Sequence, residues 1–440
     1  MKIKFLNCID YFLLICVSFL VSLGIAFIYS SAIDSNGTLT SYEYAKQAVW
    51  FGIGLVFMMF FAAFDYRKLS RYSPYIFIAF SFLLVLILIF GTVVNGAKSW
   101  IGIGSLGIQP SEFTKISFIL FLARYLSNSL EVDPLKRFLT SIIIMSVPMG
   151  LILLQPDLGT ATVFIPIFLC MCFMADIPVK YLLVIVSFGL LTILFTVIPI
   201  WGTEFSNKPS LVVKVLVNTK IKILLILASI SIAIIGIFGS IIFEKKYFRW
   251  ISEFFGVVSA SLLFSIFAGL KLKGYQIKRL IVFIDPSIDP LNSGWNIIQS
   301  KTAIGSGNFF GRGFLKGTQS HLKFLPEQST DFIFSIFSEE TGFVGGVLMF
   351  LVYLAILLRI TYIMRRTTNH FSTYICSGIL GMLFFHFVVN VGMVMGMMPI
   401  TGIPLSFMSY GGSALLSNMI AIGLVMSINS RRLDFSSSAL

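Results

Sequence analysis

The sequence predicts an all-α polytopic membrane protein, and three observations support this fold class. The mean hydropathy is +0.95, and 57% of the 440 residues are hydrophobic. Only 12% are charged, whereas a soluble domain carries roughly 25%. Apolar runs of about 20 residues, the length that crosses a bilayer, recur along the whole chain. These observations exclude a soluble globular domain and predict a bundle of transmembrane helices.

About twelve transmembrane helices are predicted from the apolar runs, within a single integral membrane domain that spans residues 1–440. The first run is about 19 residues long, which is longer than a signal-peptide core, so we expect an uncleaved span. The expected ranges are 11–29, 46–64, 75–94, 112–128, 138–154, 158–176, 180–201, 222–243, 251–270, 332–358, 372–396 and 408–428.

The net charge of +13 comes from short basic clusters between the apolar runs, such as those at 67–68, 136–137 and 365–366. Because these clusters fall in alternate connections, they predict a cytoplasmic side that holds both termini. This pattern indicates membrane orientation and no nucleic-acid partner. The five cysteines lie in or beside apolar runs, without the spacing of a disulfide framework or a zinc site.

A polar loop at 271–331 is then expected on the outer face, and its cations run against the orientation rule. They include Arg279, Lys301 and Arg312. Two interpretations stay open: a long segment that is translocated regardless of charge, or a surface for an anionic substrate. The glycines at 305–313 do not follow a buried strand, so we expect them to allow close backbone packing rather than to cradle a phosphate.

Ionisable residues inside the apolar runs are few, and each is costly in lipid unless it faces a cavity or a partner. Glu112 and Lys115 are three residues apart and share a helix face. They form either an internal ion pair or part of a substrate cavity, and the sequence leaves both open. Asp157 follows a proline at the predicted start of a span, where capping of the helix is the favoured interpretation.

Asp331 also precedes a predicted span, directly after Ser329 and Thr330. The simpler interpretation is that Ser329 or Thr330 caps this helix and that Asp331 complements its dipole. The same position would also suit an ionised carboxylate at the rim of a cavity, as a general base requires.

Several motifs spread over nearly the whole chain resemble the SEDS family of cell-wall polymerases, and more closely its RodA branch than its FtsW branch. The motifs are QPSE at 109–112, QPDLG at 155–159, GTQS at 317–320, FLPE at 324–327, TDFIF at 330–334, EE at 339–340 and the stretch 390–416 with MPITGIP. The family has a core of ten helices, so the resemblance implies a ten-helix bundle with about two extra spans, as an insertion at 202–270.

The resemblance implies a peptidoglycan glycosyltransferase that polymerises lipid II at the outer face of the cytoplasmic membrane during cell elongation. The family's essential carboxylate falls on Asp331, which implies that it takes the proton of the acceptor hydroxyl while polyprenyl pyrophosphate leaves. The reaction inverts the configuration of the anomeric carbon once, and pyrophosphate leaves without being protonated by an acid. A single carboxylate is therefore enough. The implied substrate-binding residues are Lys98, Trp100, Glu112, Lys115, Asp157, Arg279, Lys301, Arg312, Gln319, Glu327 and Thr330.

The implied partners are lipid II, the growing lipid-linked glycan, a class B penicillin-binding protein with transpeptidase activity and the membrane lipids. No organic cofactor is expected. Because no dense carboxylate cluster marks a metal cage, we expect at most a substrate-bridging Mg²⁺ or Mn²⁺. Two positions depart from the family pattern: Ser329 replaces a frequent His, and Ser406 replaces a usual Pro.

A different class of function competes with the polymerase. A protein with about twelve spans and intramembrane charges also suits a flippase for the same lipid-linked sugar. A flippase should line a path through the bilayer midplane with polar groups, whereas a polymerase should collect them at the outer leaflet. The polar residues favour the outer face.

Overall fold

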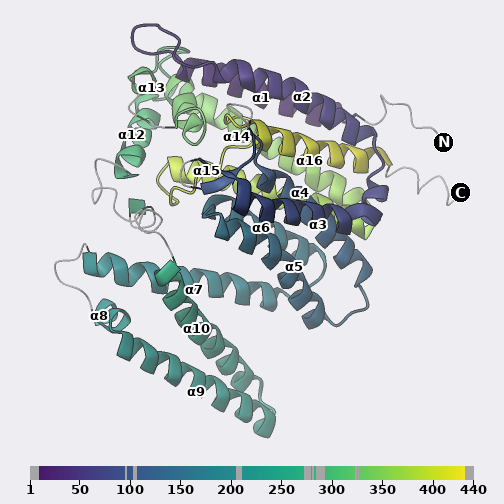
Figure 1. The fold of residues 1–440 in the computed structure, drawn as a ribbon, viewed down its shortest axis with the longest axis vertical. Helices are drawn as coiled ribbons and strands as arrows, with labels where there is room; N and C mark the ends of the chain where they lie inside the picture. Colours follow the sequence, from purple (N-terminus) through teal and green to yellow (C-terminus); the bar gives the residue numbers. More distant parts are fainter. Residues whose placement is uncertain are drawn as a thin grey trace, which may run out of the picture. The chain divides into compact units, whose positions relative to one another are not determined.

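A computed structural model describes residues 9–94, 97–102, 107–204, 211–271, 279, 282–283, 293–322, 325 and 327–431. The chain forms two compact units (Figure 1), one made of Met1–Ile177 and Asn296–Leu440, the other of Pro178–Trp295. The second unit contains the predicted insertion together with the helix that precedes it. The prediction of an insertion stays untested.

The larger unit is a helical bundle with one small hairpin. Its helices are α1 (Tyr11–Ser31), α2 (Glu43–Ala63), α3 (Tyr66–Phe90), α4 (Pro110–Asn128), α5 (Pro134–Leu154), α6 (Leu158–Met174), most of α12 (Ser293–Ser306), α13 (Thr318–His321), α14 (Ile333–Arg366), α15 (His370–Val394) and α16 (Gly412–Arg431). The antiparallel strands β1 (Thr92–Val94) and β2 (Ala97–Trp100) connect α3 to α4. The sequence did not predict this hairpin.

The smaller unit consists of α7 (Val179–Glu204), α8 (Leu211–Val217), α9 (Thr219–Phe243) and α10 (Lys246–Lys271). Helices α9 and α10 pack against each other in an antiparallel hairpin, with Gly236 of α9 against the backbone of Phe248 and Ser252. The turn between them places Glu244 in a left-handed conformation, with φ of 49°.

Each of the twelve expected spans overlaps a helix, mostly within about five residues at either end, but α3 begins nine residues before the expected start at 75 and α14 ends eight residues after the expected end at 358. In the described part of the chain, ten helices are long and apolar enough to cross a membrane. The other two are α4, which carries Glu112, Lys115 and Arg124, and α6, which has 17 residues. The prediction of an all-α polytopic membrane protein is therefore confirmed.

Helices α15 and α16 form the centre of the larger unit. The apolar windows that would cross the membrane are 72% buried in α15 and 83% buried in α16, against 22% in α2 and α3. Helix α15 packs on α4, α6 and α14, and α16 packs on α2. The described ends of α1 and α16 point to one end of the unit, while α12 and α13 lie at the other (Figure 1).

Helix α14 is interrupted near its start by Gly342, which has φ of 69° and ψ of −164°. This conformation is essentially restricted to glycine. A Cβ at Gly342 would overlap the backbone nitrogen of Gly311, and one at Gly311 would overlap the carbonyl oxygen of Glu340. Two segments of backbone therefore pack here without room for side chains, which confirms the close packing predicted for the glycines at 307 and 311, whereas a Cβ at Gly305 would meet nothing within 4 Å and one at Gly313 would meet only the Lys316 side chain.

We expect the Gly342→Ala variant to be less stable than the wild type by at least about 1–3 kcal/mol, because alanine disfavours this backbone conformation and its Cβ has no space. The matched control is Gly346→Ala, one turn later in α14, where an added Cβ meets nothing within 4 Å. Thermal unfolding of both variants in detergent measures the difference. Equal unfolding midpoints would contradict the prediction.

Candidate functional site

Asp331 lies in a turn that directly precedes α14. The N-cap of α14 is Phe332, and no side chain caps the helix. The prediction that Ser329 or Thr330 caps this helix is therefore wrong. The turn folds back on itself instead, because the amide of Asp331 donates to the carbonyl of Glu327 at 3.2 Å and the Thr330 hydroxyl donates to the Glu327 carboxylate at 3.2 Å.

Hydrogen bonds to main-chain carbonyls join this turn to residues 395–411, the connection between α15 and α16. The side-chain amide of Asn390 donates to the carbonyls of Asp331, at 3.0 Å, and Ile403, at 2.8 Å. The amide of Tyr410 donates to the carbonyl of Ser329 at 2.8 Å. A Cβ on Gly402 would stand 3.6 Å from Oδ2 of Asp331. The partly exposed carboxylate thus lies beside a glycine in a fixed frame.

Glu112 and Lys115 form an ion pair of 2.8 Å, and their side chains are only 4% and 1% exposed. Nε2 of His386 lies 3.2 Å from the Lys115 ammonium, and the Ser417 hydroxyl donates to Glu112 at 3.3 Å. Nδ1 of His386 lies 3.2 Å from the carbonyl of Pro404, in the 395–411 connection. In this conformation the pair is covered by protein, and contact with a substrate stays a prediction.

Asp157 is the N-cap of α6, as the sequence favoured, and its carboxylate accepts from the amide of Thr160 at 3.0 Å. It also accepts from the Gln109 side chain, at 3.0 Å, which joins α6 to the start of α4. Burial raises the pKa of the Asp157 carboxyl above its ordinary value, although the hydrogen bonds from Thr160 oppose this change. Gly159 packs directly on the carbonyl of Thr401.

Arg312 and Gln319 lie in a segment whose backbone amides donate hydrogen bonds to two buried glutamates of α14, Glu339 and Glu340. Glu339 accepts from the amides of Thr318, Gln319 and Ser320 at 2.7, 2.9 and 3.3 Å, at the start of α13. The guanidinium of Arg312 donates to the carbonyl of Ser306 at 3.2 Å and the Thr318 hydroxyl at 2.8 Å. Glu340 accepts from the amide of Leu315 at 3.0 Å and from the Ser30 hydroxyl.

The remaining predicted residues are more scattered. Lys301 is exposed on α12, and its side-chain end lies against Gly396 of the 395–411 connection. Lys98 lies on β2 and donates to the carbonyls of Leu88 and Ile89 at 3.0 and 2.8 Å, so it caps the end of α3. Trp100 ends the same strand. Arg279 belongs to the smaller unit, so its position relative to Asp331 is undefined. Three further cations of the 271–331 loop, Lys273, Lys278 and Lys323, lie outside the described residues.

His386 and Asn390 are the polar residues of the site that sequence reasoning did not single out. They are four residues apart on α15 and are 1% and 0% exposed, and they contact the 395–411 connection at neighbouring carbonyls. The sequence signal that could have identified them is the occurrence of two polar side chains four residues apart within an apolar span, because such side chains face a partner rather than lipid.

Within the described ranges, no three His, Cys, Asp or Glu side chains come together as ligands for a metal ion. The residues present do not form a cage for a resident ion. A substrate-bridging Mg²⁺ or Mn²⁺ needs fewer protein ligands, and it stays a prediction.

Comparisons with known proteins agree with this architecture. A family profile described as a cell cycle protein, and named for FtsW, RodA and SpoVE, matches residues 10–204 and 198–433. The chain belongs to the FtsW/RodA/SpoVE family. This multi-pass membrane protein is 48% identical to the peptidoglycan glycosyltransferase RodA of Treponema pallidum, over 98% of this chain and 100% of the relative. It is 32% identical to the peptidoglycan glycosyltransferase MrdB of Escherichia coli K12, over 88% and 85% of the two chains.

Solved structures extend the comparison for this FtsW/RodA/SpoVE family member. One chain comes from a peptidoglycan synthase complex described as coordinating polymerization and crosslinking, with a TM-score of 0.68, 26% identity and coverage of 96% and 98%. RodA of Thermus thermophilus matches with a TM-score of 0.60 at 24% identity, over 96% and 97% of the two chains. The latter similarity shows a shared fold.

Proposed function

We propose that this protein is a peptidoglycan glycosyltransferase that polymerises lipid II during cell elongation, with Asp331 as the general base. The observation that carries the proposal is the full-length similarity, at 48% identity, to a RodA described as a peptidoglycan glycosyltransferase. The geometry supports it, because a partly exposed carboxylate is held at the start of α14 by main-chain contacts that leave its position fixed.

The reaction needs one proton transfer and one inversion. The acceptor sugar's 4-hydroxyl attacks the anomeric carbon of the donor strand, and its proton passes to Asp331 as the new glycosidic bond forms. The bond from the anomeric carbon to the diphosphate oxygen breaks, and polyprenyl diphosphate leaves with both bonding electrons. Because a diphosphate leaves without protonation, a second carboxyl group is not required, in contrast to glycosidases.

Lys301 is our preferred partner for the substrate diphosphate. Lys301 is an exposed residue, and the end of its side chain lies beside the 395–411 connection, whereas Lys115 is paired and covered and Lys98 caps α3. Arg312 is exposed but is already bonded to Ser306 and Thr318. A Mg²⁺ or Mn²⁺ ion would bridge the diphosphate to the protein and neutralise further charge. Glu327 and Thr330 are bonded to each other in the turn that carries Asp331, and their contact with substrate stays a prediction.

We further propose that the end of the bundle bearing Asp331 faces outward and that both termini are cytoplasmic, as the basic clusters indicate. The partner is a class B penicillin-binding protein. Support comes from the similar chain in a synthase complex whose description couples polymerization to crosslinking.

The proposal is tested by incubating purified protein with labelled lipid II, with and without the transpeptidase partner, and separating the glycan products by size. We expect long strands that require intact Asp331. Movement of labelled lipid II between leaflets without any strand growth would instead support the flippase. The identity to named glycosyltransferases argues against that alternative.

Asn390 is expected to position the turn that carries Asp331, so Asn390→Ala should lower kcat about a hundredfold, the cost of a misplacement of about 1 Å. The control is Asn429→Ala, which removes a side chain that donates to Asp10 at 2.9 Å at the other end of the bundle. Rates are compared per folded protein. A kcat for Asn390→Ala close to that of Asn429→Ala would refute the positioning role.

A further inference from the structure

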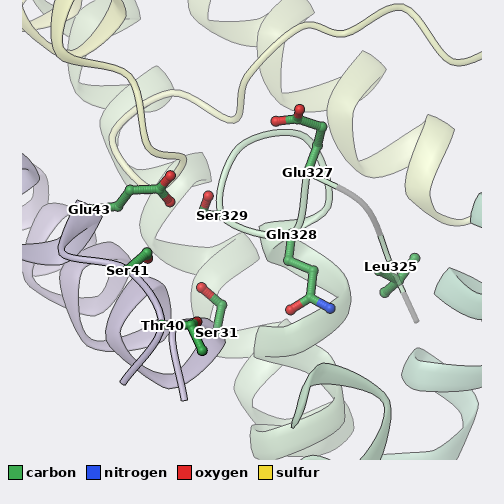
Figure 2. Close-up of a pocket in the computed structure, with 8 residues that line it drawn as sticks. All are labelled: Ser31, Thr40, Ser41, Glu43, Leu325, Glu327, Gln328 and Ser329. Atoms are coloured by element: carbon green, nitrogen blue, oxygen red, sulfur yellow. The ribbon is translucent and has the colours of Figure 1, made fainter. Parts of the chain in front are cut away.

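A polar pocket of about 310 Å³ opens next to the turn that carries Asp331. Figure 2 shows side chains from both sides of it: Ser31, Thr40 and Glu43 from α1, α2 and their connection, and Glu327, Gln328 and Ser329 from the turn. Its volume suits one small polar group rather than a whole sugar chain. The mechanism above makes no use of it.

The charge of the pocket favours a cationic ligand. Among the described residues that line it, eight in number, two are glutamates and none is Lys, Arg or His. Glu43 lies in the first turn of α2, and its carboxylate faces Ser329 across the opening (Figure 2). Glu327 stands at the rim, with its carboxylate turned away from Ser31 and Thr40. Such a lining repels a diphosphate and attracts an ammonium group.

A second observation points to a ligand that also carries an acceptor. Gln328 is only 9% exposed, and in Figure 2 the oxygen of its side-chain amide lies on the side of Ser31 and the nitrogen on the side of Leu325, two residues that line the pocket. Its Nε2 is buried and has no hydrogen-bond partner among the described residues. A buried donor without an acceptor is costly, and a carbonyl oxygen from a ligand would satisfy it. An ammonium group near a carbonyl is characteristic of an amino-acid residue.

The pocket is rigidly linked to Asp331. Gln47, one turn after Glu43 on α2, donates to the carbonyl of Ser409 at 3.1 Å and accepts from the amide of Gly411 at 3.2 Å. Tyr410 lies between Ser409 and Gly411, and its backbone amide donates to the carbonyl of Ser329. A group held in the pocket is therefore held at a defined position relative to the carboxylate of Asp331.

We propose that this pocket binds the side-chain ammonium of a basic residue in the peptide carried by the substrate, with Glu43 as its counter-ion and Gln328 as the donor to a peptide carbonyl. This inference rests on the proposed function, since it names the part of lipid II that the pocket recognises. It makes the enzyme selective for a precursor whose peptide carries a free amine.

The test compares two lipid II substrates, one with the free side-chain amine and one with that amine acetylated, for wild type, Glu43→Gln and Glu131→Gln. Glu131 is an exposed glutamate in the connection between α4 and α5, at the opposite end of α4, and serves as the control. We expect acetylation to raise the KM of the wild type and of Glu131→Gln about tenfold, since a charge-assisted hydrogen bond is lost. Glu43→Gln should show the raised KM with both substrates.

Equal KM values of the wild type for the two substrates would overturn the inference while leaving the proposed function intact. Discrimination that persists in Glu43→Gln would overturn it as well. If neither substrate is polymerised, the proposed function fails, and binding of the two lipids to the wild-type protein, measured by calorimetry, then decides the inference by itself. The wild-type comparison does not depend on whether Glu43→Gln folds.

Discussion

The Asp331→Asn variant is expected to lose glycan polymerisation by about a hundredfold to ten-thousandfold, the contribution of a positioned general base. Its fold should survive, because the contacts that hold the turn use the backbone of Asp331, namely its carbonyl with Asn390 and its amide with Glu327. Loss of the charge near the start of α14 should cost only about 0.3–1 kcal/mol. Polymerisation of labelled lipid II, matched for folded protein, measures the effect.

The control for this variant is Glu327→Gln, which removes the nearest carboxylate in the same turn. Glu327 is exposed, with φ of 51°, and its carbonyl rather than its carboxylate holds Asp331. Because Glu327 is predicted to contact substrate and not to take the proton, we expect this variant to raise KM while retaining most of its kcat. The assignment of Asp331 as the base would be contradicted by normal chain growth in Asp331→Asn. It would also be contradicted if Glu327→Gln lost as much polymerisation activity as Asp331→Asn.

The Glu112→Gln variant should be destabilised by about 3–5 kcal/mol, because it leaves the ammonium of Lys115 buried without its counter-ion. Both side chains are almost completely covered, and His386 on the far side of Lys115 does not supply a negative charge. The shift in thermal unfolding in detergent measures the loss. A cavity-lining pair open to solvent would instead lose activity with little change in stability.

The double variant Glu112→Gln with Lys115→Met separates the charge effect from the loss of packing. Replacing both partners of a buried pair with neutral side chains of similar size is often neutral or stabilising, so we expect most of the stability to return. A double variant as unstable as Glu112→Gln alone would show that the unpaired charge of Lys115 is not the cause of the loss.

Hydropathy alone predicted the helices well, because the length of an apolar run follows directly from the thickness of the bilayer. The ends of the helices were less predictable. Ser329 and Thr330 have the side chains of typical caps, yet the Ser329 carbonyl binds Tyr410 and the Thr330 hydroxyl binds Glu327. A contact between residues 81 positions apart overrode a local preference, and the sequence gives no sign of it.

The candidate site was supplied by the motifs rather than by local reasoning. Asp331 came from the resemblance, whereas local preference favoured a cap. The break at Gly342 was not foreseen, since a single glycine in an apolar run is common and its conformation depends on the backbone of Gly311 packed against it. His386 and Asn390 escaped notice because their partners are carbonyls of the 395–411 connection, which carry no sequence signature.

The use of main-chain carbonyls around Asp331 has a consequence for sequence variation. The acceptors at Ser329, Asp331 and Ile403 exist whatever side chain stands there, whereas the donor of Asn390 belongs to one residue type. We therefore expect replacement of the half-buried Ser329 to leave these hydrogen bonds intact, and replacement of Asn390 to remove two of them. The serine at 329, where the family resemblance implies histidine, is therefore accommodated without displacing the neighbouring carboxylate.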